Sequence, residues 1–482
     1  MDGPISVHFH PQQAVRFCVP EAMRFLLFVF LGLCTSVLAA PPNIIFILAD
    51  DMGWADLRCQ GHPYAQTPNL DRLASDGTRF TQCYATGVTC CPSRTGFMTG
   101  KFPATFANYP AGAGFGDRVT ITELLKRQGY ATGHFGKWHI GPVTDHGTYG
   151  IDHIGAAAEE SGGQRKRKRE AAASARGRDA DMYDAAIRFI EQHKDGPFYV
   201  NIWDHIPHHP VNPSPAVTEA FGPLEVDESL FPQPMRDKFA RCKAQGGDVS
   251  THMRAYLAEI KAMDAEIGAL LKRLDELGLR DNTLIAFSSD QGPAGIRESL
   301  VGKPEKQGAN NTLDIRLNAM GFVGSFKGGK HDPHEGGVRI PWILRWPGHV
   351  PAGRVDETAV LSGADWLPTL CALAGVEINA MEFDGENASA AWLGRDFTRS
   401  KPLLWKTSST GSDPALRVDR WKFHGTQRKK GSIELYDLAT DPGETINLAD
   451  QRPEVVRQLS ETLAAWTASL PKSYDKSDEK ED

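Results

Sequence analysis

The sequence lacks a surplus of positive charge, a large number of cysteines and any internal repeat. Its formal net charge is −7 at pH 7, whereas proteins that neutralise nucleic-acid phosphates carry a clear basic excess. Eight cysteines in 482 residues are too few for a disulfide scaffold in a domain of this size, although one or two bridges stay open. These absences argue against a nucleic-acid-binding protein, a disulfide-rich scaffold and a repeat protein.

Long apolar runs are also scarce, and the one near the N-terminus is typical of an export signal. Arg24 precedes the apolar run Phe25–Leu33, and small residues follow it. The run is too short to cross a bilayer. We therefore expect a cleaved signal peptide over residues 1–40, no membrane span, and a secreted or periplasmic protein. Met23 as the true start and lipid attachment at Cys34 stay open as alternatives.

The remaining composition, 41% hydrophobic and 23% charged, is that of an ordinary globular protein. Apolar segments of strand and helix length alternate up to about residue 375, and short strands with a final helix follow. We expect a large domain over 41–375, a smaller subdomain over 376–470 and a charged tail over 471–482. A basic run over 156–178 contains no aromatic residues, so we interpret it as a solvated face rather than a binding surface.

Polar residues follow the ends of four predicted strands. Asn43–Ala49 is a continuous apolar run, which is typical of a central strand covered on both faces. The three other strands are predicted at Tyr130–Phe135, Phe198–Trp203 and Leu284–Ser288. The polar residues that come after the four strands are, in chain order, Asp50 and Asp51, Lys137 and His139, His208, and Asp290 and Gln291. Because strand ends at one edge of a parallel sheet converge, we expect these side chains to share one site.

Carboxylates from two separate strands indicate a bound divalent cation. Adjacent carboxylates repel each other unless a cation lies between them, and carboxylate and amide oxygens are the ligands of hard ions such as Ca²⁺. Asp50 and Asp51 alone would fit a strand-exit turn equally well. Asp290, on another strand, favours the cation.

The segment Val88–Lys101 places a cysteine beside a potential anion site. It reads VTCCPSRTGFMTGK, and Pro92 suits the first turn of a helix that begins at Cys90. Free N–H groups at such a helix terminus, together with the guanidinium of Arg94, favour a tetrahedral oxyanion. The pattern indicates a nucleophile beside an anion site, although a lone cysteine is more often simply buried or disulfide-bonded. We assign that inert role to Cys91.

This segment resembles the signature of the type I sulfatases, formylglycine-dependent enzymes of the alkaline phosphatase superfamily. Further motifs of that family follow in order along the chain: Gly136–His139, Pro207–Pro210, Asp264, Lys330–Pro341 and Leu435–Leu448. The resemblance implies an α/β fold whose large, mixed, mostly parallel sheet is sandwiched by helices. It also implies a smaller C-terminal α+β subdomain with an antiparallel sheet, and makes the large domain the catalytic one.

The resemblance assigns a chemical role to each candidate residue. It implies that a maturation enzyme oxidises Cys90 to formylglycine, whose hydrate attacks the sulfur of a sulfate ester. The expected calcium ligands, besides the modified Cys90, are Asp50, Asp51, Asp290 and Gln291. Arg94 is expected to brace the hydrate, and His139 to orient or deprotonate it. Lys137, Lys330 and His208 are expected to neutralise the sulfate oxygens, with His208 or Lys330 protonating the leaving oxygen.

One position departs from the family pattern, because Gln291 stands where asparagine is most common. The longer side chain puts metal affinity, rather than the fold, in doubt. Export and polar, glycine-rich loops near 111–116 and 302–311 favour a sulfated carbohydrate as substrate. The sugar and the oligomeric state stay open. The alternatives are a phosphonate monoester or phosphodiester hydrolase with the same modified cysteine, and a non-catalytic binder of sulfated glycans.

Overall fold

The structure, a computed structural model, describes residues 41–471 except 109, 142–145, 156–174, 297–313, 379–380, 407–413 and 426–432. Four sequence-based expectations therefore fall wholly or mostly outside the described residues: the signal peptide, the charged tail, most of the basic run and the loop near 302–311. Within the described part, no helix combines the length and apolarity needed to cross a membrane. The six described cysteines are all free.

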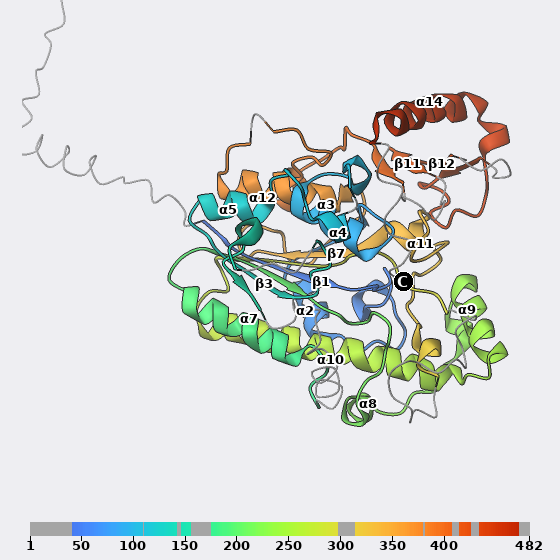
Figure 1. Cartoon of the computed structure of the whole chain (residues 1–482). Helices are drawn as coiled ribbons and strands as arrows, with labels where there is room; N and C mark the ends of the chain where they lie inside the picture. The colour runs from blue at the N-terminus through green and yellow to red at the C-terminus, as the bar shows by residue number, and fades with distance from the viewer. Residues whose placement is uncertain are drawn as a thin grey trace, which may run out of the picture. The chain divides into compact units, whose positions relative to one another are not determined.

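A nine-stranded sheet forms the centre of the molecule (Figure 1). Its order is β4-β3-β5-β1-β6-β7-β2-β8, with β9 also paired to β2. The strands are β1 (Asn43–Ala49), β2 (Thr78–Tyr84), β3 (Ala131–Gly136), β4 (His153–Ile154), β5 (Phe198–Trp203), β6 (Thr283–Ser289), β7 (Arg339–Arg345), β8 (Arg354–Asp356) and β9 (Leu361–Ser362). Among the described strand pairs of this sheet, only those of β7 with β6 and β2 are antiparallel, so the sheet is mixed and mostly parallel.

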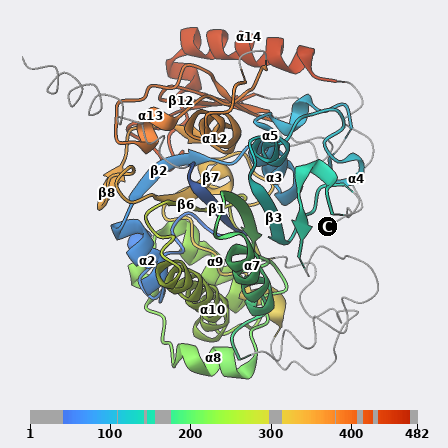
Figure 2. The same ribbon diagram turned by 90° about the vertical axis from the view of Figure 1, so that its left-hand side faces the viewer.

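Helices cover both faces of this sheet, as Figures 1 and 2 show. One face carries α3 (Cys90–Thr99), α5 (Ile121–Arg127) and α12 (Trp366–Ala374), and the other carries α2 (Pro68–Ser75), α7 (Ala180–His193) and α10 (Val249–Glu276). Further helices of the described part of the chain are α4 (Pro110–Ala113), α8 (Pro215–Phe221), α9 (Gln233–Ala244), α11 (Glu335–Val338) and α13 (Ser389–Trp392).

The central strand β1 is apolar on both faces because each face has its own core. Ile45 and Ile47 belong to the core beneath α7 and α10, whereas Phe46 points to the opposite core. There its ring lies 5.0 Å from Phe97 of α3 and 4.5 Å from Trp366 of α12. Burial on both sides fixes the strand, and with it the position of the residues that follow Ala49.

A second, four-stranded antiparallel sheet lies in the C-terminal part of the chain. Its order follows the sequence: β10 (Leu403–Trp405), β11 (Ala415–Val418), β12 (Trp421–His424) and β13 (Glu434–Asp437). Helix α14 (Pro453–Ser469) shares a core with this sheet through Leu459 and Leu463. The expected fold class, a large mixed sheet between helices with a smaller antiparallel α+β unit, is confirmed.

Candidate functional site

Four neighbouring parallel strands deliver the predicted site residues to one edge of the sheet. In the order β3-β5-β1-β6, Gly136 is level with Trp203, Trp203 with Leu48, and Ala49 with Ser289. The strands therefore end in line, and the polar residues that follow them begin from adjacent positions. The structure brings together all ten residues singled out from the sequence: Asp50, Asp51, Cys90, Arg94, Lys137, His139, His208, Asp290, Gln291 and Lys330.

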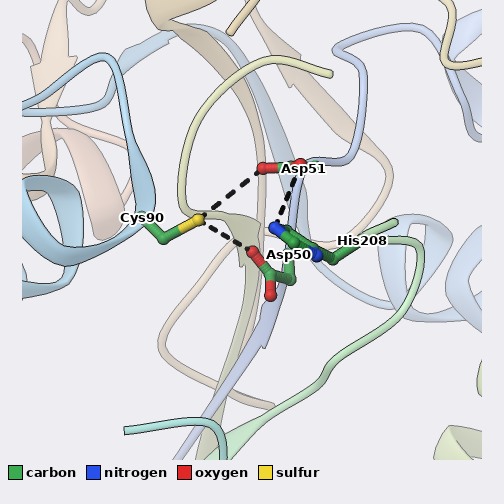
Figure 3. Close-up of side chains that lie close together, drawn as sticks. All are labelled: Asp50, Asp51, Cys90 and His208. Carbon is green, nitrogen blue, oxygen red and sulfur yellow. Dashed lines mark hydrogen bonds and ion pairs between the residues drawn. The ribbon is translucent and has the colours of Figure 1, made fainter. Parts of the chain in front are cut away.

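Cys90 is the first residue of α3, as predicted, and its side chain points into the site (Figure 3). It is only 2% exposed, with its Sγ atom 3.2 Å from Asp50 Oδ1 and 3.7 Å from Asp51 Oδ1. Burial, followed by the Asp50 carboxylate, raises the pKa of the Cys90 thiol well above its ordinary value. Reactive cysteines instead occupy electropositive surroundings that favour the thiolate. The unmodified thiol is therefore protonated and a poor nucleophile.

Arg94, one turn further along α3, is completely buried and connects three of the strand ends. Its Nε and Nη2 atoms donate to Asp290 Oδ2 at 3.0 and 2.8 Å, and Nη1 donates to the Lys137 carbonyl at 2.8 Å. Nη2 also lies 3.5 Å from Asp50 Oδ1, and the guanidinium carbon is 5.2 Å from the centre of the Trp203 ring. A planar fork with several donors suits such a junction better than a single ammonium group would.

Two lysines balance the aspartates that follow β1. Lys137 Nζ donates to Asp50 Oδ2 at 2.7 Å, and Lys330 Nζ donates to Asp51 Oδ2 at 3.2 Å. Burial alone would raise the pKa of Asp50, but Lys137, His208 and Arg94 outweigh burial and hold that pKa well below its ordinary value. Asp50 is therefore a carboxylate at neutral pH, paired with a full positive charge.

His208 faces Lys330 with its Nε2 atom. Its Nδ1 lies within hydrogen-bond distance of the His209 carbonyl oxygen, which can only accept, so Nδ1 carries the proton. Nε2 is then the acceptor, 3.2 Å from Lys330 Nζ and 3.7 Å from Asp51 Oδ2. Burial lowers the pKa of His208 to about 4 although both aspartates oppose this. The imidazole is neutral at pH 7, and the expected positive charge at this position comes from the lysines instead.

His139 has a left-handed backbone with φ of 59°, which non-glycine residues adopt infrequently. Its Nδ1 is buried and has no hydrogen-bond partner among the described residues. Burial and the nearby Lys137 charge lower the pKa of His139 to about 3, so this ring is also neutral at pH 7. A strained residue with an unused buried nitrogen at a shared strand edge is a typical feature of functional sites.

The acidic part of the site fits a hard divalent cation. Asp50, Asp51, Cys90 and His208 each place one possible ligand atom within 4.8 Å of the others (Figure 3). Beside them, the Oε1 atom of Gln291 is a buried acceptor with no hydrogen-bond partner among the described residues. An amide oxygen without a donor, next to fully buried carboxylates, is the environment that Ca²⁺ prefers.

The carboxylate of Asp290 holds the backbone of this cluster in place. Its Oδ1 atom accepts the backbone N–H groups of Asp51 and Gln291, each at 3.0 Å, and the Gln291 Nε2 atom contacts Asp51 Oδ1. The amide group of Gln291 therefore lies beside the carboxylates, although the side chain is one methylene longer than that of asparagine. We infer that the extra methylene does not displace the amide from the site.

A second cluster, which the sequence analysis did not single out, joins the segment after Lys330 to the small sheet. The rings of His334 and His424 stack with centroids 4.0 Å apart, and His424 Nε2 lies 3.1 Å from Glu444 Oε1. Glu444 Oε2 in turn accepts the Glu335 backbone N–H at 2.7 Å. No sequence pattern predicts this cluster, because its members meet only when β12 packs against the residues around α11.

The loop that carries His208 has polar contacts that the sequence analysis also missed. Arg178, Asp179 and Glu259 all bond to it. Interpreting residues 156–178 as a solvated basic face is therefore wrong for Arg178, whose side chain is 21% exposed and paired with Glu259. The error arose because a run of charges in the sequence does not reveal which of its members will turn toward the protein.

Comparison with known proteins agrees with this geometry. The family model described as Sulfatase matches residues 42–376, and the model described as N-sulphoglucosamine sulphohydrolase, C-terminal, matches residues 329–469. The two matches together cover both sheets. The first extends over more than half of the chain and includes every residue of the site.

Individual relatives align over most of their length. Human arylsulfatase A is 29% identical, with 88% of this chain and 87% of the relative covered. The N-acetylgalactosamine-6-O-sulfatase of Bacteroides thetaiotaomicron is also 29% identical, with 88% and 92% covered. The solved structure of Ps i-CgsB with k-i-k-neocarrahexaose superposes with a TM-score of 0.71 at 24% identity, covering 91% of this chain and 95% of that chain. The chain is therefore a member of the type I sulfatase family, a family of sulfuric ester hydrolases.

Proposed function

We propose that this protein is an exported enzyme that hydrolyses a sulfate monoester of a carbohydrate, with formylglycine made from Cys90 as nucleophile and Ca²⁺ as cofactor. The observation that carries the proposal is the position of Cys90, buried at the start of α3 between Asp50 and Asp51. A thiol held protonated by its surroundings cannot serve as the nucleophile itself. In its hydrated form, formylglycine supplies an oxygen nucleophile at that position.

The two lysines are the proposed binding groups for the sulfate oxygens. Lys137 and Lys330 reach the same pair of aspartates beside Cys90, so a sulfate group placed against Cys90 lies within the field of both ammonium groups. Charge on the sulfate shifts toward the leaving oxygen during hydrolysis, and fixed cations stabilise that change. Because His208 Nε2 is an acceptor in the geometry described above, we assign protonation of the leaving oxygen to Lys330.

The proposed calcium ligands are Asp50, Asp51, Asp290 and Gln291, together with the modified side chain of residue 90. The ion would supply positive charge next to the nucleophile. A single divalent site with two lysines suits a singly charged sulfate ester better than a phosphate monoester, which often recruits two metals. The sugar substrate is supported by the relative named N-acetylgalactosamine-6-O-sulfatase.

The choice of ester is tested by comparing aryl sulfate with aryl phosphate turnover. The full mature chain is produced together with a formylglycine-generating enzyme, and mass spectrometry establishes the state of the peptide that contains Cys90. We expect conversion of Cys90 and a clear preference for sulfate, followed by activity within a panel of defined sulfated saccharides. A preference for phosphate would favour the phosphoesterase alternative, and an unconverted thiol without turnover would favour a glycan binder.

Removing the amide of Gln291 tests its assignment as a metal ligand. Gln291→Met keeps the approximate length of the side chain and removes the amide oxygen, so we expect the Kd for Ca²⁺ to rise at least about tenfold. Calorimetric titration of the calcium-free protein measures this without substrate. Gln60→Met is the matched control, since Gln60 is another buried glutamine that is not among the site residues. An unchanged Kd in Gln291→Met would remove this residue from the ligand set.

A further inference from the structure

The loop that carries His208 has no regular secondary structure, yet it must place one imidazole accurately. Residues 205–212 follow β5 and include Pro207 and Pro210, which have no backbone N–H to donate. The backbone carbonyl oxygens of the loop nevertheless need hydrogen-bond partners. Such a loop needs donors from elsewhere in the protein to hold its backbone in one conformation.

Arg178, just before α7, supplies those donors. Its Nη2 atom donates to the carbonyls of His205 at 2.7 Å and His208 at 2.9 Å, and its Nη1 atom donates to the Pro210 carbonyl at 3.2 Å. One guanidinium therefore holds three carbonyls spread over six residues, including the carbonyl of His208 itself. The fixed fork of arginine can do this, whereas the single ammonium group of lysine cannot.

Two carboxylates complete the arrangement from both sides. Glu259 of α10 lies 2.9 Å from Arg178 Nη2, and it also accepts the Asn212 backbone N–H at 3.0 Å. Asp179 accepts the backbone N–H of His205 at 2.9 Å and contacts His205 Nδ1 at 3.0 Å. Both carboxylates are buried; Glu259 pairs with the guanidinium, and Asp179 holds the start of the loop at His205.

We infer that Arg178 is a positioning residue for the reaction, and that it acts by fixing the loop so that His208 Nε2 faces Lys330. The inference rests on the proposed function of the site for its catalytic consequence, but the positioning of the loop does not depend on the substrate. Moving a catalytic group by about 1 Å can cost on the order of 100-fold in rate. Loss of the fork should therefore lower kcat more than it raises KM.

The main test compares Arg178→Lys and Arg178→Gln with the wild-type full chain carrying modified Cys90. We expect kcat to fall by about 10- to 100-fold, with a much smaller change in KM. Arg176→Gln is the matched control, because Arg176 lies two residues away and pairs with Glu266 and Asp184 instead. Arg178→Lys keeps the charge, so it remains informative if Arg178→Gln fails to fold. An unchanged kcat in a folded Arg178 variant would overturn the inference.

A double-mutant cycle with His208→Ala shows whether the effect passes through the imidazole. If Arg178 acts through His208, the double variant Arg178→Lys/His208→Ala will be no slower than His208→Ala alone. If the rate loss of the double variant equals the product of the two single-variant losses, Arg178 acts independently of His208, and the inference is overturned. The cycle is measured with whichever aryl ester the wild type hydrolyses. The ester preference of the wild type tests the proposed function, and the cycle tests the role of Arg178 separately.

Hydrogen exchange provides a readout that needs no turnover at all. The amide of His208 donates to the His205 carbonyl at 2.9 Å, inside the segment that Arg178 holds. In Arg178→Lys we expect faster exchange in the peptide that spans 205–212 and unchanged exchange in the peptide from α7. Equal exchange in both proteins would contradict a positioning role, even if the wild type proved inactive on every ester tested.

Discussion

We expect the substitution Cys90→Ala to abolish ester hydrolysis while the protein keeps its fold. The substitution removes the thiol that the proposed conversion of Cys90 to formylglycine requires, and no other side chain among the described site residues offers an equivalent nucleophile. By analogy with other enzymes that lose their nucleophile, we expect kcat to fall on the order of 10⁴-fold or more. The measurement is aryl sulfate turnover by the purified variant, produced with the same maturation enzyme as the wild type.

Folding should be affected far less, because only one sulfur atom leaves the core. Cys90 is buried, but its Sγ contacts polar groups rather than a packed apolar cluster, so we expect little change in melting temperature. Cys91→Ala is the matched control, since the adjacent thiol is equally buried and belongs to the apolar core behind α3. Turnover that survives in Cys90→Ala would overturn the proposed mechanism.

Elements with strong local signals could be predicted from the sequence. The apolar run of β1 matches Asn43–Ala49 in the structure, and α3 begins at Cys90 as Pro92 predicts. Because parallel strands align their ends, the residues after β1, β3, β5 and β6 could be placed in one site before any contact was known. The antiparallel direction of β7 could not, because strand direction depends on pairing partners far away in the chain.

Contacts between distant segments account for what the sequence did not reveal. Arg178 appears in the sequence as the end of a basic run, and only the packing of α7 against the loop after β5 turns it toward the His205, His208 and Pro210 carbonyls. The protonation of Cys90 is similar, since its raised pKa comes from burial and from Asp50, which lies forty positions earlier. Local patterns identify residue types suited to the chemistry, whereas the fold decides their charge and orientation.

Arg94→Met is the second substitution with a large expected effect, and it should damage stability and activity together. Arg94 is fully buried and neutralises Asp290 at 2.8 Å while lying 3.5 Å from Asp50. Removing one partner of a buried ion pair leaves an uncompensated charge, which typically costs about 3–5 kcal/mol. Loss of a cation beside the reacting group should also lower kcat by at least about 100-fold.

Urea unfolding and aryl sulfate turnover measure the two effects on the same samples. Arg457→Met is the control, because Arg457 is 72% exposed and its ion pair with Glu461 lies at the surface of α14. We expect it to change the free energy of unfolding by less than about 0.5 kcal/mol. A loss of similar size in both variants would show that the buried ion pair contributes nothing special to stability.

Calcium should reduce the stability defect of Arg94→Met, because a cation bound by Asp50 and Asp290 restores part of the missing positive charge. An ion that binds the folded state but not the unfolded chain stabilises the fold by an amount that grows with the logarithm of its free concentration divided by its Kd. The variant, with one cation fewer beside the same carboxylates, gains more from the ion than the wild type does. The difference in unfolding free energy between the two proteins should therefore be larger in a chelator than in excess Ca²⁺. An equal difference under both conditions would mean that Asp50 and Asp290 do not bind the ion in either protein.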